Sequence, residues 1–345
     1  QYVDTLTWAK GVDSVTGRPQ VNPEALYDHT GKPWVGAPGP GGGHNWMPMS
    51  FSPQTGLVYI PVIEIAFPYI GQKSYHPTPL TFNVGVDLNA GSLPQDPVIK
   101  AAALKGLKGH LAAWDPVAQK EVWRVESGHP WNGGTLATAG HVVYEGDAMG
   151  RLNAYHDADG KLLWSVQTGT GILAPPISYA VAGKQYIAVE TGWGGAFPLS
   201  AGELALKSQI NRGNIPRVIV LSLDGGDAIP SPPPASAAVL TNLPELGTAA
   251  QVAQGKLLYH TYCGTCHGDT AVSSGVLPDL RFSAALRDDD LFQKIVHDGI
   301  LEPKGMVAFG SLLDPKAIEL VRGYVTHRVN ESVAESKAAA AVPAP

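Results

Sequence analysis

The feature that most constrains this chain is the sequence CGTCH at residues 263–267. Two cysteines three positions apart lie on one helical turn, where they can bond both vinyl groups on one edge of a porphyrin. We therefore predict a covalent c-type haem, with Cys263 and Cys266 as thioether donors and His267 as the proximal iron ligand. A zinc half-site or a redox dithiol has the same spacing, but zinc would need further ligands, and the chain has 2 cysteines in all.

The second axial ligand is predicted to be Met306. Of the 4 methionines in the chain, it is the one in the same region as the haem motif, and it follows Gly305 in an expected loop. A His/Met pair raises the haem potential, which suits an electron acceptor. The competing ligands are His297, His260 and His327, and a methionine can also be a plain core residue.

Residues 248–330 have the apolar spacing of helices that bury one face. The pattern predicts a helix over residues 249–262, a second opening at Asp288 and a third over residues 315–329. Acidic residues at the start of the second helix suit the positive end of a helix dipole. Residues 331–345 are predicted to be a disordered tail.

Before this region, residues 1–228 have the pattern of short strands. Hydrophobic residues make up 44% of the chain and charged residues 16%, and its 40 glycines and 29 prolines follow no fixed period, which indicates many turns. The residues Ala113 and Trp123 recur as Ala154 and Trp164, 41 positions later. One four-stranded propeller blade needs about 40–45 residues, and we expect the indole that ends each copy to pack on the next blade. Two unrelated hairpins could show the same spacing.

A partial third copy of the repeat begins at Asp13. We count three to four blades, whereas a closed propeller has about four to eight. Unpaired strand edges seek partners, so this region is expected to complete a longer chain or to pair with a separate one. Residues 229–247 are rich in Pro, Ser and Ala and are predicted to form an extended linker. The strand candidates are residues 56–62, 141–144, 151–155, 184–189 and 217–221.

Charge and hydropathy exclude some partners. The net charge of −6 includes no basic stripe, which argues against nucleic acid. No apolar run reaches the roughly 18 residues of a transmembrane segment. Gln1 is not an initiator Met and opens no signal peptide, so we expect a processed chain or a piece of a longer one. Because haem c is attached outside the bacterial inner membrane, the predicted location is the periplasm, in a soluble or peripherally membrane-associated form.

Several stretches resemble the C-terminal half of the quinohaemoprotein alcohol dehydrogenases. Those are pyrroloquinoline quinone (PQQ) enzymes with an eight-bladed propeller followed by a cytochrome c domain. The resemblance covers nearly the whole chain, and it implies all-β propeller blades followed by an all-α class I cytochrome c domain. The matching stretches are HNWMPMSF at 44–51, TGLVYIP at 55–61, WNGGTLATAG at 131–140 and GWGG at 192–195.

The resemblance also implies which residues contact PQQ. The matching positions are Asn45 and Trp131, together with Trp46 and Trp193. An indole face can stack on a planar quinone, and an amide can bond its carbonyl edge. A propeller also buries tryptophans for packing alone, which is the competing interpretation of all three indoles.

The chain departs from the family in ways that bear on catalysis. The repeat that ends in Trp123 and Trp164 looks like the family's tryptophan-docking motif, but His156 and Gln119 occupy positions where that motif has Asp and Gly. The family's general base (an Asp), its Ca²⁺ ligands and its adjacent-cysteine disulfide come from earlier blades, and we match none of them here. The catalytic residues are therefore left unassigned, and the isolated chain is not expected to oxidise alcohol.

The function implied is a part in alcohol oxidation. In the family, alcohol is oxidised to aldehyde by PQQ held with Ca²⁺, and electrons pass through haem c to an external cytochrome, blue-copper protein or ubiquinone. The alternative is an electron-transfer cytochrome c subunit whose β part is a docking module without dehydrogenase activity. A haem-d1 nitrite reductase also joins a cytochrome to a propeller, but in the reverse order. Ethanol, longer primary alcohols and polyols are all compatible substrates.

Overall fold

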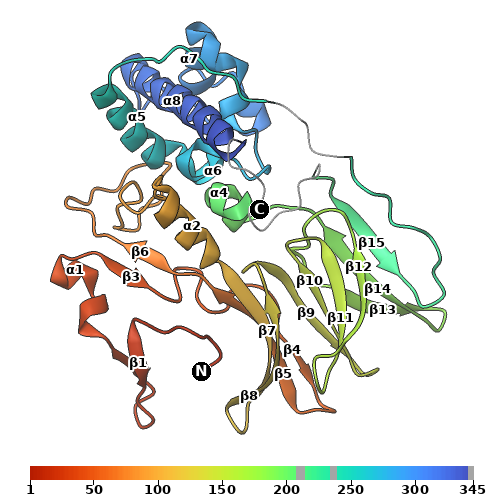
Figure 1. The fold of residues 1–345 in the computed structure, drawn as a ribbon. Coiled ribbons are helices and arrows are strands. Elements are labelled where there is room, and N and C mark those ends of the chain that lie inside the picture. Colours follow the sequence, from red (N-terminus) through yellow and green to blue (C-terminus); the bar gives the residue numbers. More distant parts are fainter. Residues whose placement is uncertain (207–213, 234–238, 341–345) are drawn as a thin grey trace.

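The computed structural model describes residues 1–206, 214–233 and 239–340. Its strands lie in the first two thirds of the chain, and its longest helices lie in the last third (Figure 1). The helical part sits against one end of the strand-bearing part, next to its short helices (Figure 1). No helix in the described ranges combines the length and the apolar character that crossing a membrane requires.

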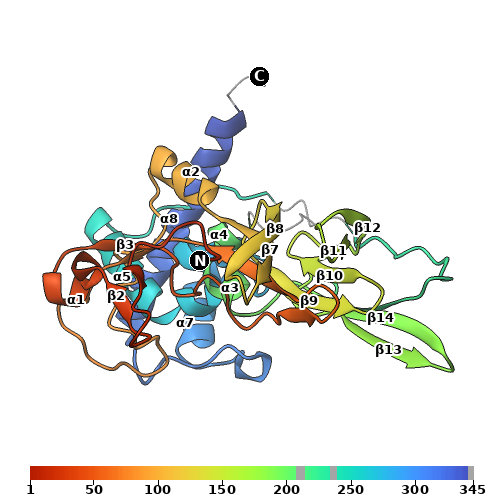
Figure 2. The ribbon, with the colours of Figure 1, turned by 90° about the horizontal axis from the view of Figure 1, so that it is seen from below.

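One antiparallel four-stranded sheet has the order β4-β5-β7-β8. Residues 65–107 are inserted between its second and third strands and carry other elements. The sheet twists so that its last hairpin, β7–β8, faces the next sheet (Figures 1 and 2). Its strands are β4 (Ser50–Ser52), β5 (Leu57–Glu64), β7 (Lys108–Asp115) and β8 (Lys120–Ser127).

The following sheet is a four-stranded meander, and the one after it has three strands in the order β13-β14-β15. Each of the five predicted strand runs overlaps a strand of these sheets, and the runs 56–62 and 141–144 begin one residue before β5 and β10. The sheets are open, as propeller blades are, and they do not close a ring among the described residues. The strands are β9 (Asn132–Thr138), β10 (Val142–Asp147), β11 (Arg151–His156), β12 (Leu162–Gln167), β13 (Ile177–Val181), β14 (Lys184–Thr191) and β15 (Arg217–Leu221).

Smaller elements complete the strand-bearing part. β1 (Ala9–Val12) pairs with β2 (Pro19–Val21), and β3 (Trp34–Gly36) pairs with β6 (Phe67–Tyr69). This part also contains short helices, which the all-β prediction did not include. They are α1 (Tyr27–Thr30), α2 (Pro97–Lys105), α3 (Ala196–Ser200), α4 (Glu203–Leu206) and the 3-10 helix η1 (Pro23–Ala25).

The 41-residue repeat corresponds to the last hairpin of each four-stranded sheet. The indole of Trp123 donates to the carbonyl of Asp157 at 3.0 Å and lies against Gly160, where an added Cβ would approach the ring to 2.6 Å. This docking of one sheet on the next is the contact that the repeat predicted. Trp164, by contrast, is 43% exposed.

Hydrogen bonds in the turns of the repeat explain the role of its aspartate and how the chain replaces it. Asp115 and Asp13 each accept two backbone N–H groups of the turn that follows, an arrangement that stabilises a tight turn. Where His156 replaces the aspartate, Asp159 accepts the N–H of Lys161 instead. Gln119 occupies the left-handed region at φ 53°, the conformation that makes glycine usual there.

The part after residue 248 is built of helices. α5 (Ala249–Tyr262) begins with a capping box between Thr248 and Gln251 and ends where predicted. α6 (Gly264–His267) follows it directly, α7 (Asp289–Val296) is capped by Asp288, and α8 (Pro315–Ala340) packs across α5. The 3-10 helices are η2 (Asp269–Ala271), η3 (Leu280–Phe282), η4 (Ala284–Arg287) and η5 (Glu302–Lys304).

One prediction about this part was wrong. The tail expected to be disordered from residue 331 is helical as far as Ala340, because α8 continues for eleven residues past the predicted end. Val333 on this extension is buried, and Arg328 pairs with Glu331 there, so both packing and charge favour the longer helix. Residues 341–345 of that tail lie outside the described ranges. Of the predicted linker, residues 229–233 and 239–247 contain no helix or strand.

Candidate functional site

The haem motif forms a single turn between two helices. Cys263 ends α5, and its carbonyl accepts the backbone N–H groups of Cys266 at 3.1 Å and His267 at 2.9 Å. Both cysteines are free thiols; Cys263 is buried and Cys266 is exposed. The turn therefore brings the three predicted haem residues together.

Burial sets the protonation states at this turn. Burial, with a smaller contribution from Cys266, raises the pKa of the Cys263 thiol to about 12, so the thiol is neutral. Burial also lowers the pKa of His267, against a smaller opposing effect of the Pro278 carbonyl. The Nδ1 atom of His267 is buried without a hydrogen-bond partner among the described residues. Two free thiols beside a neutral imidazole fit a covalently held haem.

Met306 lies close by in the fold. It follows Gly305, whose φ of 92° ends η5, and it packs against the buried cluster that contains Cys263 and Phe309. This helical core includes residues of α5, α7 and α8. Its largest fully buried side chains are those of Tyr259, Ile318 and Val321.

The competing histidines have polar partners elsewhere. His260 is held on both ring nitrogens, by the Lys256 carbonyl and by Asp269, each at 2.9 Å. His297 contacts Asp298 at 2.7 Å, and His327 lies between two glutamates.

An aromatic cluster lies where the strand-bearing part meets the helical part. Trp131 is 7% exposed and stacks on Phe197 with ring centroids 4.5 Å apart. Trp193 is 3% exposed, and its Nε1 donates to the carbonyl and hydroxyl oxygens of Ser274 at 3.1 and 3.2 Å. The structure thus brings two of the four predicted quinone contacts into one cluster, together with the fully buried Met47.

The other two predicted quinone contacts lie outside this cluster. Asn45 and Trp46 are both exposed, and the Asn45 amide bonds locally, to the Gly41 carbonyl and to the Trp46 backbone N–H. Sequence reasoning selected Trp46 and passed over the adjacent Met47, because the pattern of residues 44–49 does not reveal which side chain turns inward. It also missed Phe197, although that residue follows the GWGG stretch closely.

Asp269 makes a further link between the two parts. Its Oδ1 bonds His260 on α5, and its Oδ2 accepts the backbone N–H of Leu93 at 2.7 Å. Lys100 on α2 pairs with Glu335 on α8 at 3.6 Å, and within the strand-bearing part it also pairs with Glu203 on α4 at 2.6 Å. The haem turn is therefore held against the strand-bearing part by specific polar contacts.

Comparison with known proteins matches both parts. A model of the β-propeller domain of glucose, ethanol and alcohol dehydrogenases matches residues 101–187, and a model of the cbb3-type cytochrome c oxidase subunit III matches residues 250–325. The dehydrogenase subunit of the quinone alcohol dehydrogenase of Komagataeibacter europaeus is 44% identical over 95% of this chain and 44% of its own length. The quinohemoprotein alcohol dehydrogenase ADH IIB of Pseudomonas putida is 42% identical over 97% of this chain and 47% of its own length.

Solved structures agree with these matches. The quinohemoprotein alcohol dehydrogenase ADHIIG of Pseudomonas putida HK5 superimposes with a TM-score of 0.86 at 34% identity, over 96% of this chain and 48% of its own. The quinohemoprotein alcohol dehydrogenase of Comamonas testosteroni superimposes with a TM-score of 0.73 at 33% identity, over 95% of this chain and 46% of its own. The chain thus spans a little under half the length of the relatives it matches.

Proposed function

We propose that this chain corresponds to part of a quinohaemoprotein alcohol dehydrogenase, with propeller strands followed by a cytochrome domain. Its role would be to carry electrons away from PQQ, after alcohol has been oxidised to aldehyde, and to pass them to an external acceptor. The observation that carries the proposal is the haem turn at Cys263, Cys266 and His267, docked beside the aromatic cluster of the strand-bearing part.

The residues of this chain would hold the haem as follows. Cys263 and Cys266 would form the thioethers, and His267 would bind the iron, since its lowered pKa keeps the ring neutral at neutral pH. Met306 would be the second axial ligand, which its packing against the core around Cys263 supports. A c-type haem so bound supplies a one-electron carrier with a raised potential.

The aromatic cluster would form part of a wall for the quinone. Trp131 and Trp193 are rigid and buried, whereas the exposed Asn45 and Trp46 are free to meet a ligand or further protein. Trp193 would also connect that wall with the cytochrome part through Ser274. We propose no general base and no Ca²⁺ ligands in this chain; in the family these come from the earlier blades.

Location and partners follow from the same proposal. Attachment of haem c outside the inner membrane makes the periplasm the proposed compartment, with a soluble or peripheral form. The external acceptor would be a cytochrome, a blue-copper protein or ubiquinone, and propeller blades beyond these would complete the quinone site.

The test uses the chain expressed with a working haem-ligation system. We expect a covalent haem whose absorbance has the His/Met form, and no alcohol-dependent haem reduction after PQQ and Ca²⁺ are added. Colourless protein would overturn the haem assignment. Haem reduction by alcohol in the isolated chain would overturn the proposal that this chain lacks the general base and the Ca²⁺ ligands. Co-purification with an unrelated protein in place of further blades would favour the docking-module alternative.

A further inference from the structure

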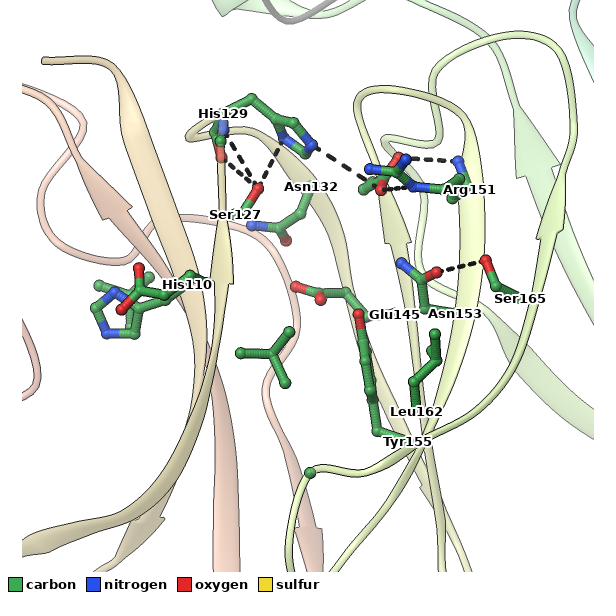
Figure 3. A pocket seen from close by; sticks show the side chains of 16 residues that line it. His110, Ser127, His129, Asn132, Glu145, Arg151, Asn153, Tyr155, Leu162 and Ser165 are labelled. Carbon is green, nitrogen blue, oxygen red and sulfur yellow. Dashed lines mark hydrogen bonds and ion pairs between the residues drawn. The ribbon is translucent and has the colours of Figure 1, made fainter. Parts of the chain in front are cut away.

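A cavity of about 390 Å³ opens between the β7–β8 hairpin and the following four-stranded sheet (Figure 3). Its volume falls within the range of about 300–1,000 Å³ that small-molecule sites occupy. The polar side chains around it come from both sheets (Figure 3). They include Ser127, His129, Asn132, Glu145, Arg151 and Asn153.

Glu145 on β10 is the unusual group in this cavity. The residue is 9% exposed, and its carboxyl group makes no hydrogen bond or ion pair with any described residue. Figure 3 shows it pointing into the space between the sheets. Asp147, two residues along the same strand, is satisfied by the backbone N–H and guanidinium of Arg151 at 2.8 and 3.2 Å. Ionising a largely buried carboxyl group that has no partner is costly, and a cationic ligand in the cavity would offset that cost.

His129 adds a second unfilled acceptor. The Ser127 hydroxyl donates its proton to the His129 carbonyl at 2.8 Å. The hydroxyl oxygen must therefore accept the hydrogen bond from Nδ1 of the His129 ring, and the same Nδ1 atom faces the Trp131 carbonyl. Nδ1 therefore carries the proton, and burial lowers the pKa of His129 and keeps the ring neutral. The bare Nε2 then lies 3.9 Å from a carboxylate oxygen of Asp147, leaving two acceptors side by side with no donor between them.

The chemistry of a matching ligand follows from this surplus of acceptors. A ligand with several N–H donors and a positive charge would satisfy Glu145 and the bare Nε2 of His129, next to the Asp147 carboxylate that Arg151 already pairs with. A metal ion fits less well, because the three-membered cluster found among the described residues with ligand atoms within 4.8 Å of one another involves Asp4, Glu64 and His110 instead. In that cluster the Asp4 carboxylate already pairs with Lys108 and Arg124, Glu64 accepts the Asp4 backbone N–H, and His110 faces the Tyr2 carbonyl.

We propose that the cavity between these sheets binds a small organic ammonium compound, with Glu145 as the principal recognition group. The cavity adjoins Trp131 of the quinone wall, whose carbonyl faces His129, but it is lined by other side chains, so this inference does not depend on the proposed function. The hydrocarbon part of the ligand would lie against the apolar side chains of Val62 and Leu162 in the cavity lining.

Binding is expected to depend on pH. Burial and then the charge of Asp147 raise the pKa of Glu145 to about 8, and the ammonium ligand prefers the ionised carboxylate. Below that pKa the affinity should fall by about tenfold for each pH unit. The other charged or titratable groups that line the cavity are Asp147 on β10, Arg151 and Tyr155 on β11, Glu126 on β8, His129 after β8 and His110 on β7.

The experiment is a calorimetric titration of the haem-loaded chain with 1,4-diaminobutane. Its neutral counterpart, 1,4-butanediol, has the same length and lacks the charge. We expect saturable binding of the diamine alone, with an affinity that rises with pH. Glu145→Gln should weaken it at least about tenfold and abolish the pH dependence, as expected when a charge-assisted hydrogen bond is lost. Glu145→Asp should keep the pH dependence, and the exposed Glu24→Gln should change nothing.

Three results would overturn the proposal. The first is no saturable binding at concentrations up to about 10 mM, well above a millimolar Kd. The second is equal binding of the diol and the diamine, and the third is unchanged binding in Glu145→Gln. Tryptophan fluorescence and the haem spectrum check that each variant is folded.

Discussion

The indole Nε1 of Trp193 donates to the backbone carbonyl of Ser274 at 3.1 Å and joins the aromatic cluster to the loop that follows the haem turn. Both groups are buried, so neither can exchange this bond for one with water. The contact makes Trp193 part of the junction between the two parts, whatever it contributes to the quinone wall.

Trp193→Phe tests this junction. An aromatic ring is kept, but the hydrogen bond is lost and the smaller ring leaves a cavity at this buried position, so we expect the free energy of unfolding to fall by at least about 1 kcal/mol. Denaturant unfolding, followed through haem absorbance and fluorescence, measures it. Trp164→Phe is the control, because Trp164 is 43% exposed, and an equal loss there would contradict the prediction.

Met306→Ala tests the second axial ligand. We expect the haem to stay attached through its cysteines, to lose the His/Met form of its absorbance and to shift to a lower reduction potential. Spectroscopy and a redox titration measure both effects. Met49→Ala is the matched control, because Met49 lies in the strand-bearing part and is 50% exposed. An unaltered spectrum in Met306→Ala would remove Met306 from the site.

Gly255→Ala tests the crossing of α5 and α8. A Cβ at Gly255 would lie 2.0 Å from the Leu320 carbonyl oxygen, so the helices would have to move apart. We expect a loss of about 1–3 kcal/mol in the free energy of unfolding, the usual cost of overpacking. Thermal or denaturant unfolding measures it. Gly226→Ala should be nearly neutral, because nothing lies within 4 Å of its added Cβ.

Glu145→Gln should change how stability depends on pH. The pKa of Glu145 is raised to about 8 in the folded chain, above the roughly 4.3 of an unfolded one, so the folded state binds more protons between these values. Stability from this group is therefore full below about pH 4.3 and falls by up to about 1.4 kcal/mol per pH unit as the pH rises toward 8.

The amide variant cannot ionise, so its stability relative to the parent chain should increase with pH over that interval. Denaturant unfolding across the range, without added amine, measures the difference. A constant difference would show that the Glu145 carboxyl ionises as easily in the folded chain as in the unfolded one.

Much of the local structure was predictable from short-range patterns. The helix over Ala249–Tyr262 begins and ends as predicted, because the capping pair Thr248 and Gln251 and the apolar spacing lie within a few residues of one another. The 41-residue repeat predicted an indole at the contact between sheets; Trp123 makes that contact, whereas the equivalent Trp164 is 43% exposed. The length of α8 was not predictable in the same way, because the burial of Val333 depends on the neighbouring helices.

The sequence by itself determined the turn at residues 263–267, since two cysteines and a histidine within five positions must share about one helical turn. It also determined the order of strands and helices, which follows from local propensity. Tertiary structure decided that Trp131 and Trp193 turn inward while Asn45 and Trp46 stay exposed, and that Glu145 faces a cavity with no partner. Those outcomes depend on how sheets and helices far apart in the chain pack together, and no local pattern encodes that packing.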